Sequence, residues 1–299
     1  MLEKHALVEV GLELKALGYV FTAITPESHR RVLARNVPAA GLRDVFGWNR
    51  PFSEALLSPA MLAALRQSDV ICAAHAAYVS QVRFATLYDA IYVHSGFPTL
   101  AQEAVFFGPD TYRYARWLRQ HVVAAERVVD IGCGSGAGGL CLQDRVAHIC
   151  LADINPQALR YARMNAEMLG IAERVECVFS DVLTAVQGSF DLVISNPPYM
   201  VDEAERAYRH GGDLWGAALS VRIVRESLAR LAPGGQLVLY TASAIVDGVD
   251  TFWQAIQPLL QGHEVVYEEI DPDVFGEELA RPVYVQVDRL AVVGLVVRC

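Results

Sequence analysis

The sequence predicts an α/β protein in which a mostly parallel sheet is covered by helices and preceded by a smaller α+β domain. Two observations indicate this fold. After residue 126, short apolar runs alternate with segments of helical period, as in parallel strands joined by helices. Before residue 95, helical segments lead into a run in which apolar residues alternate, as in an antiparallel ribbon. We therefore expect an accessory domain at residues 1–104 and a larger domain at residues 105–299.

The composition is that of a folded protein with a large core. The chain has 299 residues, of which 53% are hydrophobic and 20% are charged. No run approaches the roughly 20 apolar residues of a membrane span, and the first residues do not form a signal-peptide pattern. The six cysteines include no C-x-x-C pair, so we expect reduced thiols, a cytoplasmic protein, no metal site and no membrane partner. The net charge of −9 argues against a large phosphate-binding surface.

The first part of the chain is expected to be helical up to about residue 75. Apolar residues recur at helical spacing before Gly18, namely Leu7, Val10, Leu14 and Leu17. Two shorter helices are expected at 28–33 and 53–65, and the second of these can begin at Pro59 instead. Between them, residues 41–51 have the composition of a turn-rich stretch.

An antiparallel strand pair is expected between Tyr78 and His94, where apolar residues alternate with others. Several arginines are concentrated in this half of the chain. They indicate a solvated helix face with ordinary ion pairs more than a patch that faces a substrate. These residues are Arg30, Arg31, Arg35, Arg43 and Arg50.

The second part of the chain alternates strands and helices. Strands are expected at 127–131, 148–153, 174–179, 191–195, 236–241, 264–270 and 290–298. Helices are expected at 111–121, 156–169, 217–231 and 251–260. Asp110 directly precedes the first of these helices and is expected to be its N-cap.

A glycine-rich loop, Asp130-Ile-Gly-Cys-Gly-Ser-Gly136, joins the first of these strands to a helix. Because glycine has no Cβ, such a loop lets a ligand approach the backbone closely. The spacing G-x-G-x-G differs from the dinucleotide pattern G-x-G-x-x-G. Asp153 ends the next strand about twenty residues later, where a carboxylate can accept hydrogen bonds from ribose hydroxyls. Asp181 ends the third strand and faces the same crevice.

The fourth strand runs into Asn196-Pro-Pro-Tyr199. A pair of prolines ends the strand and stiffens the following turn. The Asn196 amide oxygen, the neighbouring carbonyl groups and the Tyr199 ring can together bind an –NH2 group on an sp2 carbon. In isolation, this tetrapeptide is equally consistent with a strand-ending turn whose tyrosine lies in the core.

In this order and spacing, the motifs resemble the class I S-adenosylmethionine-dependent methyltransferases that carry N-P-P-Y after the fourth strand. This branch includes the HemK-like ("methyltransferase small") protein-glutamine methyltransferases and the adenine and guanine amino-methyltransferases of RNA and DNA. The resemblance covers residues 105–299. It implies a Rossmann-like, seven-stranded, mostly parallel sheet, with S-adenosyl-L-methionine as cofactor and S-adenosyl-L-homocysteine as product.

The resemblance also implies a role for each motif. The loop residues Gly132, Cys133, Gly134 and Gly136 are expected under the methionine and ribose of the cofactor, and Asp130 near its amino group. Asp153 would accept the ribose hydroxyls. The adenine would lie against Ile154, Asp181 and Val182, while Phe107 and Thr111 belong to the segment that closes over the methionine end. Asn196, Pro197, Pro198 and Tyr199 are the expected catalytic residues, and Asn196 also contacts the cofactor.

The methyl acceptor is expected to be a macromolecule with a planar amide or amino nitrogen. The pair Gly211-Gly212 after the N-P-P-Y loop resembles the HemK-like pattern, and the acidic Asp202, Glu203 and Glu205 fit a nucleic acid poorly. A release-factor glutamine is therefore the first expectation. The predicted strand pair near residue 85 departs from the HemK helical bundle, which leaves an RNA or DNA base as the alternative. A non-catalytic cofactor-binding scaffold and a nicotinamide-dependent reductase are more distant alternatives.

Overall fold

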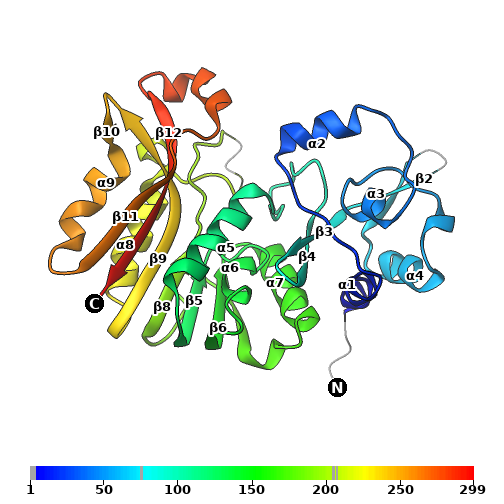
Figure 1. The fold of residues 1–299 in the computed structure, drawn as a ribbon, viewed down its shortest axis with the longest axis horizontal. Helices are drawn as coiled ribbons and strands as arrows, with labels where there is room; N and C mark the ends of the chain where they lie inside the picture. Colours follow the sequence, from blue (N-terminus) through cyan, green and yellow to red (C-terminus); the bar gives the residue numbers. More distant parts are fainter. Residues whose placement is uncertain (1–4, 75–76, 204–205, 207) are drawn as a thin grey trace.

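The fold is described from a computed structural model that covers residues 5–74, 77–203, 206 and 208–299. One large sheet contains β5 (Ala125–Ile131), β6 (Val146–Asp153), β7 (Val175–Phe179), β8 (Phe190–Ser195), β9 (Leu231–Val246), β10 (Val249–Asp250), β11 (Glu264–Asp271) and β12 (Arg289–Arg298). The strand order is β11-β12-β9-β8-β5-β6-β7, and the short β10 pairs with β9 (Figure 1). Along this order, pairing is antiparallel at β12 and parallel elsewhere. The predicted mostly parallel sheet is confirmed, with seven strands in this order and the short β10 as an eighth strand that was not predicted.

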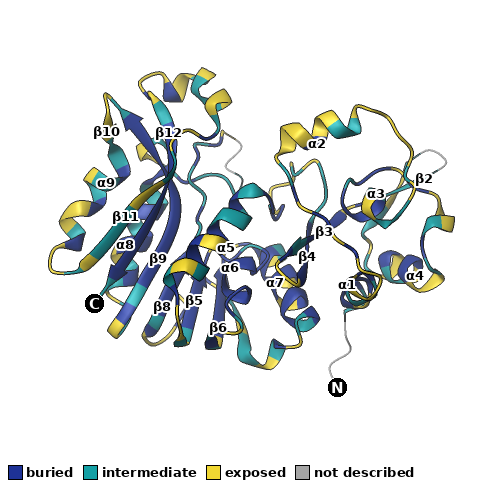
Figure 2. Cartoon of the chain, viewed as in Figure 1, coloured by how far each residue is buried: buried dark blue, intermediate teal, exposed yellow. Residues whose placement is uncertain are grey.

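Helices cover both faces of this sheet. One face packs against α5 (Pro109–His121), α6 (Ala137–Leu140) and α7 (Pro156–Met168), and the other against α8 (Ala218–Leu228) and α9 (Thr251–Ile256). Because side chains alternate along a strand, neighbouring residues such as Val128 and Val129 belong to the two opposite cores. Both faces of the strands are therefore buried, as Figure 2 shows for the central strands, and this explains their nearly continuous apolar sequences.

The sheet places the two main sequence motifs side by side. β5 pairs with β6 on one side and with β8 on the other. Later strands are therefore added on opposite sides of β5, and the strand order reverses at this point. Ile131 and Ser195, the last residues of β5 and β8, are register partners. The glycine-rich loop and the N-P-P-Y loop leave the sheet from these two adjacent ends, where ligands bind in open parallel sheets.

The first part of the chain contains α1 (Ala6–Ala16), α2 (Pro26–Leu33), α3 (Leu42–Phe46), α4 (Pro59–Gln67), β1 (Ile71–Ala74), β2 (Ala77–Ser80), β3 (Val82–Leu87) and β4 (Ala90–Ser95). The expected antiparallel pair is present as β3–β4. Two elements were not predicted: α3 lies in the stretch expected to be turns, and β1 lies in the part expected to be helical. The short 3-10 helices of the chain are η1 (Glu54–Leu56), η2 (Ala172–Arg174), η3 (Leu214–Gly216), η4 (Gln257–Leu260), η5 (Gly276–Ala280) and η6 (Pro282–Tyr284).

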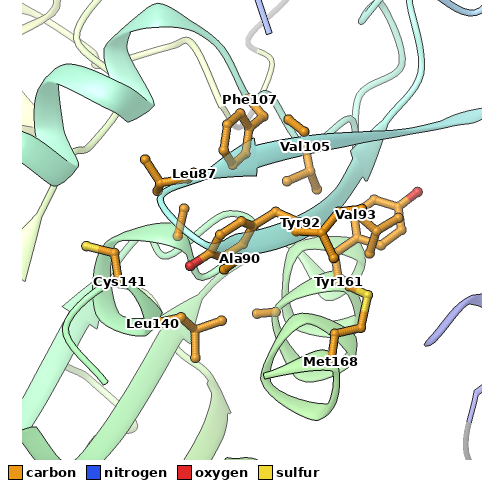
Figure 3. Close-up of a cluster of buried hydrophobic side chains, with 14 of the residues drawn as sticks. Leu87, Ala90, Tyr92, Val93, Val105, Phe107, Leu140, Cys141, Tyr161 and Met168 are labelled. Atoms are coloured by element: carbon orange, nitrogen blue, oxygen red, sulfur yellow. The ribbon is translucent and has the colours of Figure 1, made fainter. Parts of the chain in front are cut away.

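The hydrophobic core is continuous from the first helix to the large sheet. Figure 3 shows side chains of the β3–β4 hairpin, α6 and α7 packed together, with Tyr92, Leu140 and Met168 among them. A Cβ on Gly11 of α1 would lie 2.0 Å from the Met168 sulfur, so α1 approaches α7 closely. The expected division at residue 104 remains a prediction.

Two other expectations about the larger part are wrong. Gly108, not Asp110, is the N-cap of α5, because the helix already begins at Pro109. β9 is longer than expected and includes Pro233, whose missing N–H falls where the register between β8 and β9 is irregular.

Glu205, one of the acidic residues after the N-P-P-Y loop, lies outside the described residues. Among the helices that the structure describes, none has the length and apolar character needed to cross a membrane.

Candidate functional site

A cavity of about 240 Å³ opens at the carboxyl ends of β5, β6 and β8. Most of the residues predicted to form the site lie in its wall. These are Thr111, Asp130, Gly132, Cys133, Gly134, Asp153, Ile154, Asp181, Val182, Asn196, Pro197, Pro198 and Tyr199. Segments up to about 90 residues apart in sequence therefore meet around one cavity.

Two predicted cofactor-binding residues do not line the cavity. The Phe107 ring is fully buried and stacks on His94 with the ring centres 5.1 Å apart, within the core that Figure 3 shows. Its neighbour Phe106 lines the cavity instead, because successive residues of an extended segment face opposite sides. Gly136 packs against the protein interior, where a Cβ would lie 3.0 Å from Leu140. Its role is to let the chain turn at a φ of 78°.

The glycine-rich loop is held by two carboxylates. Asp153 accepts hydrogen bonds from the amides of Gly134 and Asn155, both at 2.8 Å. Asp130, which is 1% exposed, accepts one from the amide of Gly139 at 2.8 Å. Because a carboxylate has about four acceptor positions, each group keeps capacity for a ligand. Asn155 is the N-cap of α7.

The N-P-P-Y loop carries a buried hydrogen-bond acceptor to which no described group donates. Ser195 fixes the end of β8 by donating a hydrogen bond to the Ile131 carbonyl at 2.7 Å. The next residue, Asn196, faces the cavity, and its Oδ1 atom is buried without a hydrogen-bond partner among the described residues. A buried acceptor of this kind costs about 1–3 kcal/mol when it stays unpaired. The loop is therefore suited to receive an N–H group from a ligand.

The segment at 211–216 supports the N-P-P-Y loop through direct backbone contact. A Cβ on Gly211 would lie 2.6 Å from the Pro198 carbonyl oxygen, and one on Gly216 would lie 2.4 Å from the Tyr199 carbonyl oxygen. Gly211 also donates a hydrogen bond to the Met200 carbonyl at 2.8 Å. These positions require glycine because a side chain would push the two backbones apart.

This arrangement of loops on a parallel sheet agrees with comparisons to known proteins. The family model of the methyltransferase small domain matches residues 111–246. That match includes the glycine-rich loop, Asp153, Asp181 and N-P-P-Y. Residues 111–246 therefore form an S-adenosylmethionine-dependent methyltransferase domain.

Three relatives of the methyltransferase domain have different named acceptors. The chain is 35% identical over 161 residues to a release factor glutamine methyltransferase of Deinococcus radiodurans, which covers 48% of this chain and 57% of the relative. It is 36% identical over 155 residues to a tRNA1(Val) (adenine(37)-N6)-methyltransferase of Aeromonas hydrophila, covering 49% and 63%. It is 38% identical over 116 residues to a ribosomal RNA small subunit methyltransferase C of Chromohalobacter salexigens, covering 39% and 31%. The chain thus spans between about one third and two thirds of these proteins.

Solved structures agree with the fold. A Streptococcus mutans protein described as a SAM-dependent methyltransferase aligns with a TM-score of 0.53 at 14% identity, over 80% of this chain and 64% of that chain. The tRNA m1G37 methyltransferase of M. jannaschii aligns with a TM-score of 0.51 at 16% identity, over 73% and 56%. At these identities the likeness concerns the fold alone.

The methyltransferase cavity fits S-adenosylmethionine, the cofactor of this family. Gly132 has a φ of 66°, and a Cβ placed there would meet no atom of the described residues within 4 Å. The space above the loop is therefore open to a ligand. Asp153 would hold the ribose and Ile154, which is 49% exposed, would cover the adenine. Asp181, which is expected at the adenine end, pairs with Arg222 of α8 at 2.9 Å.

Burial changes the acidity of two groups in the methyltransferase site. It raises the pKa of Asp130 to about 7, although the hydrogen bond from Gly139 opposes this shift. It also raises the pKa of Tyr199 well above its usual range, and the nearby Asp110 carboxylate adds to the effect. Asp110 itself accepts a hydrogen bond from Tyr240 at 2.9 Å and pairs with Arg113 at 3.1 Å. The phenol of Tyr199 therefore stays protonated beside a fixed carboxylate.

Arginines neutralise the acidic segment after the N-P-P-Y loop. Asp202 is 5% exposed and binds Arg206 through both carboxylate oxygens, at 2.5 and 2.8 Å. The hydrogen bonds from Arg206 lower the pKa of Asp202 to about 2. Arg209 and Arg281 both pair with Glu278. We expected this acidic segment to fit a nucleic acid poorly. For Asp202 this argument no longer holds, because Arg206 neutralises its charge.

Several residues of the cavity wall were not predicted. They are Phe106, Tyr114, Tyr208 and Phe275. Tyr208 stacks on Phe106 and donates a hydrogen bond to the Thr99 carbonyl at 2.8 Å, so the cavity wall includes the segment before α5. The alternation of an extended segment indicates that only one of Phe106 and Phe107 faces the cavity, but not which one, whereas Phe275 lies in a stretch without a periodic signal.

The arginines of the first part have ordinary partners where the structure shows them. Arg30 and Arg31 pair with Glu27 on the surface of α2, and Arg50 is buried beside Asp44. Among the residues with described positions, there is no group of three or more His, Cys, Asp or Glu residues placed to hold a metal ion.

Proposed function

We propose that the chain is an N-methyltransferase that moves the methyl group of S-adenosylmethionine to a planar amide or amino nitrogen. The unpaired Oδ1 atom of Asn196 carries this proposal. An acceptor –NH2 group that donates to this atom would remove the cost of leaving a buried oxygen unpaired. The rigid Pro197-Pro198 turn keeps the oxygen in place before the acceptor arrives.

The residues of the loop overcome the weak nucleophilicity of such a nitrogen, whose lone pair is delocalised. Hydrogen bonds from its two N–H groups to Asn196 Oδ1 and the Pro197 carbonyl would favour a pyramidal nitrogen. Tyr199 would hold the plane of the acceptor by stacking. The bound cofactor supplies a sulfonium methyl group. Because the nitrogen can lose its proton after methylation, positioning and electrostatics account for the rate without a strong base.

A release-factor glutamine is one candidate acceptor. The D. radiodurans relative bears that name, and Gly211 packs against the N-P-P-Y backbone as part of the glycine pair that suggested a HemK-like enzyme. A nucleobase amine is the second candidate. It is favoured by the neutralised Asp202 and by the aromatic rings of the cavity wall, and relatives named for rRNA and tRNA methylation support it.

The direct test is methyl transfer from labelled S-adenosylmethionine into two pools, purified release factors and unmodified ribosomal and transfer RNA. Wild type is compared with Asn196→Ala and with Gln187→Ala, which removes an exposed amide before β8, at the opposite end of that strand. We expect label with wild type and Gln187→Ala and a loss of at least about 100-fold with Asn196→Ala. Cofactor binding without label in either pool would refute the proposal.

A further inference from the structure

A helix from the first part of the chain reaches the cavity. α2 begins at Pro26, directly after its N-cap Thr25, whose side chain accepts a hydrogen bond from the Ser28 amide. Pro26 lines the same cavity as Asn196 and the glycine-rich loop. The first part of the chain therefore supplies part of the wall around the site.

The buried side of α2 holds this helix in place beside the cavity. His29 is fully buried, and one of its ring nitrogens lies 3.0 Å from the Arg83 guanidinium. Its ring stacks on Phe97, with the ring centres 4.2 Å apart. The same loop contains Thr99, whose carbonyl accepts the hydrogen bond from Tyr208. One short loop therefore contacts both α2 and the segment after N-P-P-Y.

The exposed side of α2 carries two arginines next to this wall. Figure 2 shows that most of the helix is exposed. Residues four positions apart share one face of a helix, with their Cβ atoms about 6 Å apart, so Arg30 follows Pro26 along the cavity side. The Arg30 and Arg31 side chains are 65% and 72% exposed. The cavity wall thus continues into two guanidinium groups that solvent can reach.

These arginines carry a surplus of positive charge. Both pair with one carboxylate, that of Glu27, at 2.8 and 2.7 Å, so the three groups together keep one positive charge. Exposed ion pairs contribute little to stability, so the guanidinium groups can exchange Glu27 for another anion at little cost. Arginine suits phosphate groups because its planar guanidinium donates two parallel hydrogen bonds. On a chain with a net charge of −9, a basic surface beside the cavity indicates an anionic acceptor.

We propose that Arg30 and Arg31 bind the phosphates beside the target base of an RNA acceptor, so that α2 and the cavity hold one stretch of RNA together. This inference rests on the proposed function and selects its second candidate, the nucleobase amine. A nucleotide whose base lies in the cavity has a phosphate on each side of it, so negative charge lies at the rim. A glutamine side chain carries no charge, and its neighbours in a protein need not be acidic.

The test changes the charge of α2 in both directions. The double variant Arg30→Ala/Arg31→Ala removes the cations, whereas Glu27→Gln removes their competitor and leaves both cations free. Arg298→Ala is the matched control, because Arg298 also pairs with a glutamate on the surface but lies at the end of β12 that is away from the cavity. For each variant, the KM for the RNA pool and kcat are measured at several salt concentrations, together with the dissociation constant of S-adenosylmethionine and the melting temperature.

We expect the RNA pool to be labelled, with a KM that is roughly 10-fold higher in Arg30→Ala/Arg31→Ala and lower than wild type in Glu27→Gln. In the double variant, log KM should also rise less steeply with the logarithm of the salt concentration, by about 0.7 for each lost phosphate contact. The values of kcat, cofactor affinity and melting temperature should not change, and Arg298→Ala should behave as wild type.

An unchanged KM and salt slope in the double variant would overturn the phosphate contact. A KM that rises in Glu27→Gln as well would also overturn it, because the ion pairs would then act through the fold of α2. Label in release factors alone would overturn the RNA partner while leaving the proposed function intact. Label in neither pool would refute the proposed function itself, and this inference with it.

Discussion

The Asp153 carboxylate accepts a hydrogen bond from the Gly134 amide at 2.8 Å, so the end of β6 fixes the glycine-rich loop that follows β5. The same side chain is also the expected partner of the cofactor ribose. One carboxylate therefore shapes the loop and contacts the ligand that lies on it, and its removal should affect both stability and binding.

Replacing Asp153 by alanine is expected to weaken S-adenosylmethionine binding at least about 10-fold and to destabilise the free protein by about 1–3 kcal/mol. The second effect follows because two backbone amides lose a charged acceptor. Calorimetry and urea unfolding measure the two effects. Asp181→Ala is the matched control, because its exposed ion pair with Arg222 contributes about 0–1 kcal/mol to stability. Equal losses of stability in both variants would contradict the role given to Asp153.

The stability of the cofactor-free protein should fall as the pH rises from about 4 to about 7. Burial raises the pKa of Asp130 from 3.8 to about 7, so over this range the folded protein keeps a proton that the unfolded chain has lost. Stability decreases with pH wherever the folded state binds more protons. Thermal unfolding between pH 4 and 8 measures this slope against Asp130→Asn, whose profile should be flatter.

Binding of S-adenosylmethionine should respond to pH in the opposite sense. A carboxylate attracts the cofactor ammonium and a neutral carboxyl group does not, so affinity should rise as Asp130 ionises near pH 7. The dissociation constant is measured by calorimetry between pH 6 and 8. A pH dependence that is the same in Asp130→Asn would show that another group is responsible.

Gly216→Ala should destabilise the protein and disrupt methyl transfer. Gly216 has a φ of 101°, and its Cβ would lie 2.4 Å from the Tyr199 carbonyl oxygen. Gly234 provides the control, because it also has a positive φ, 76°, but a Cβ there would meet no described atom within 4 Å. The conformational cost alone, about 1–2 kcal/mol, is expected for Gly234→Ala. Gly216→Ala should exceed it by at least about 1 kcal/mol in urea unfolding. Similar losses would show that the contact with Tyr199 can relax.

The sequence predicts those parts of the molecule whose signals are local. Each buried parallel strand is a short apolar run, and the glycine-rich loop and N-P-P-Y each join a strand end to the cavity within a few residues. The missed features depend on contacts distant in sequence. Phe106 and Phe107 cannot be assigned to the cavity or the core until the orientation of their segment is known. The segment that carries Phe275 is held beside Tyr199 by Arg281 and Tyr284, which bind Val201 across 80 and 83 residues of sequence.

Asn165 connects the first part of the chain to the glycine-rich loop. This fully buried residue of α7 accepts a hydrogen bond from the Val93 amide at 2.8 Å and donates to the carbonyls of Val93 at 3.1 Å and Ser135 at 2.8 Å. Asn165→Leu leaves these groups unpaired and should cost about 2–4 kcal/mol in urea unfolding. Arg163→Ala, at an exposed position of the same helix, should stay within about 0.5 kcal/mol of wild type.

The shape of the Asn165→Leu transition bears on the expected boundary near residue 104. If the β3–β4 hairpin and the large sheet unfold together, the variant should show one transition at lower urea, with fluorescence and circular dichroism coincident. Their shared core, in which Tyr92 and Val93 pack with residues of α6 and α7, makes this the expected result. Two separate transitions would show instead that residues 1–104 fold as an independent accessory domain and that Asn165 merely joins it to the methyltransferase domain.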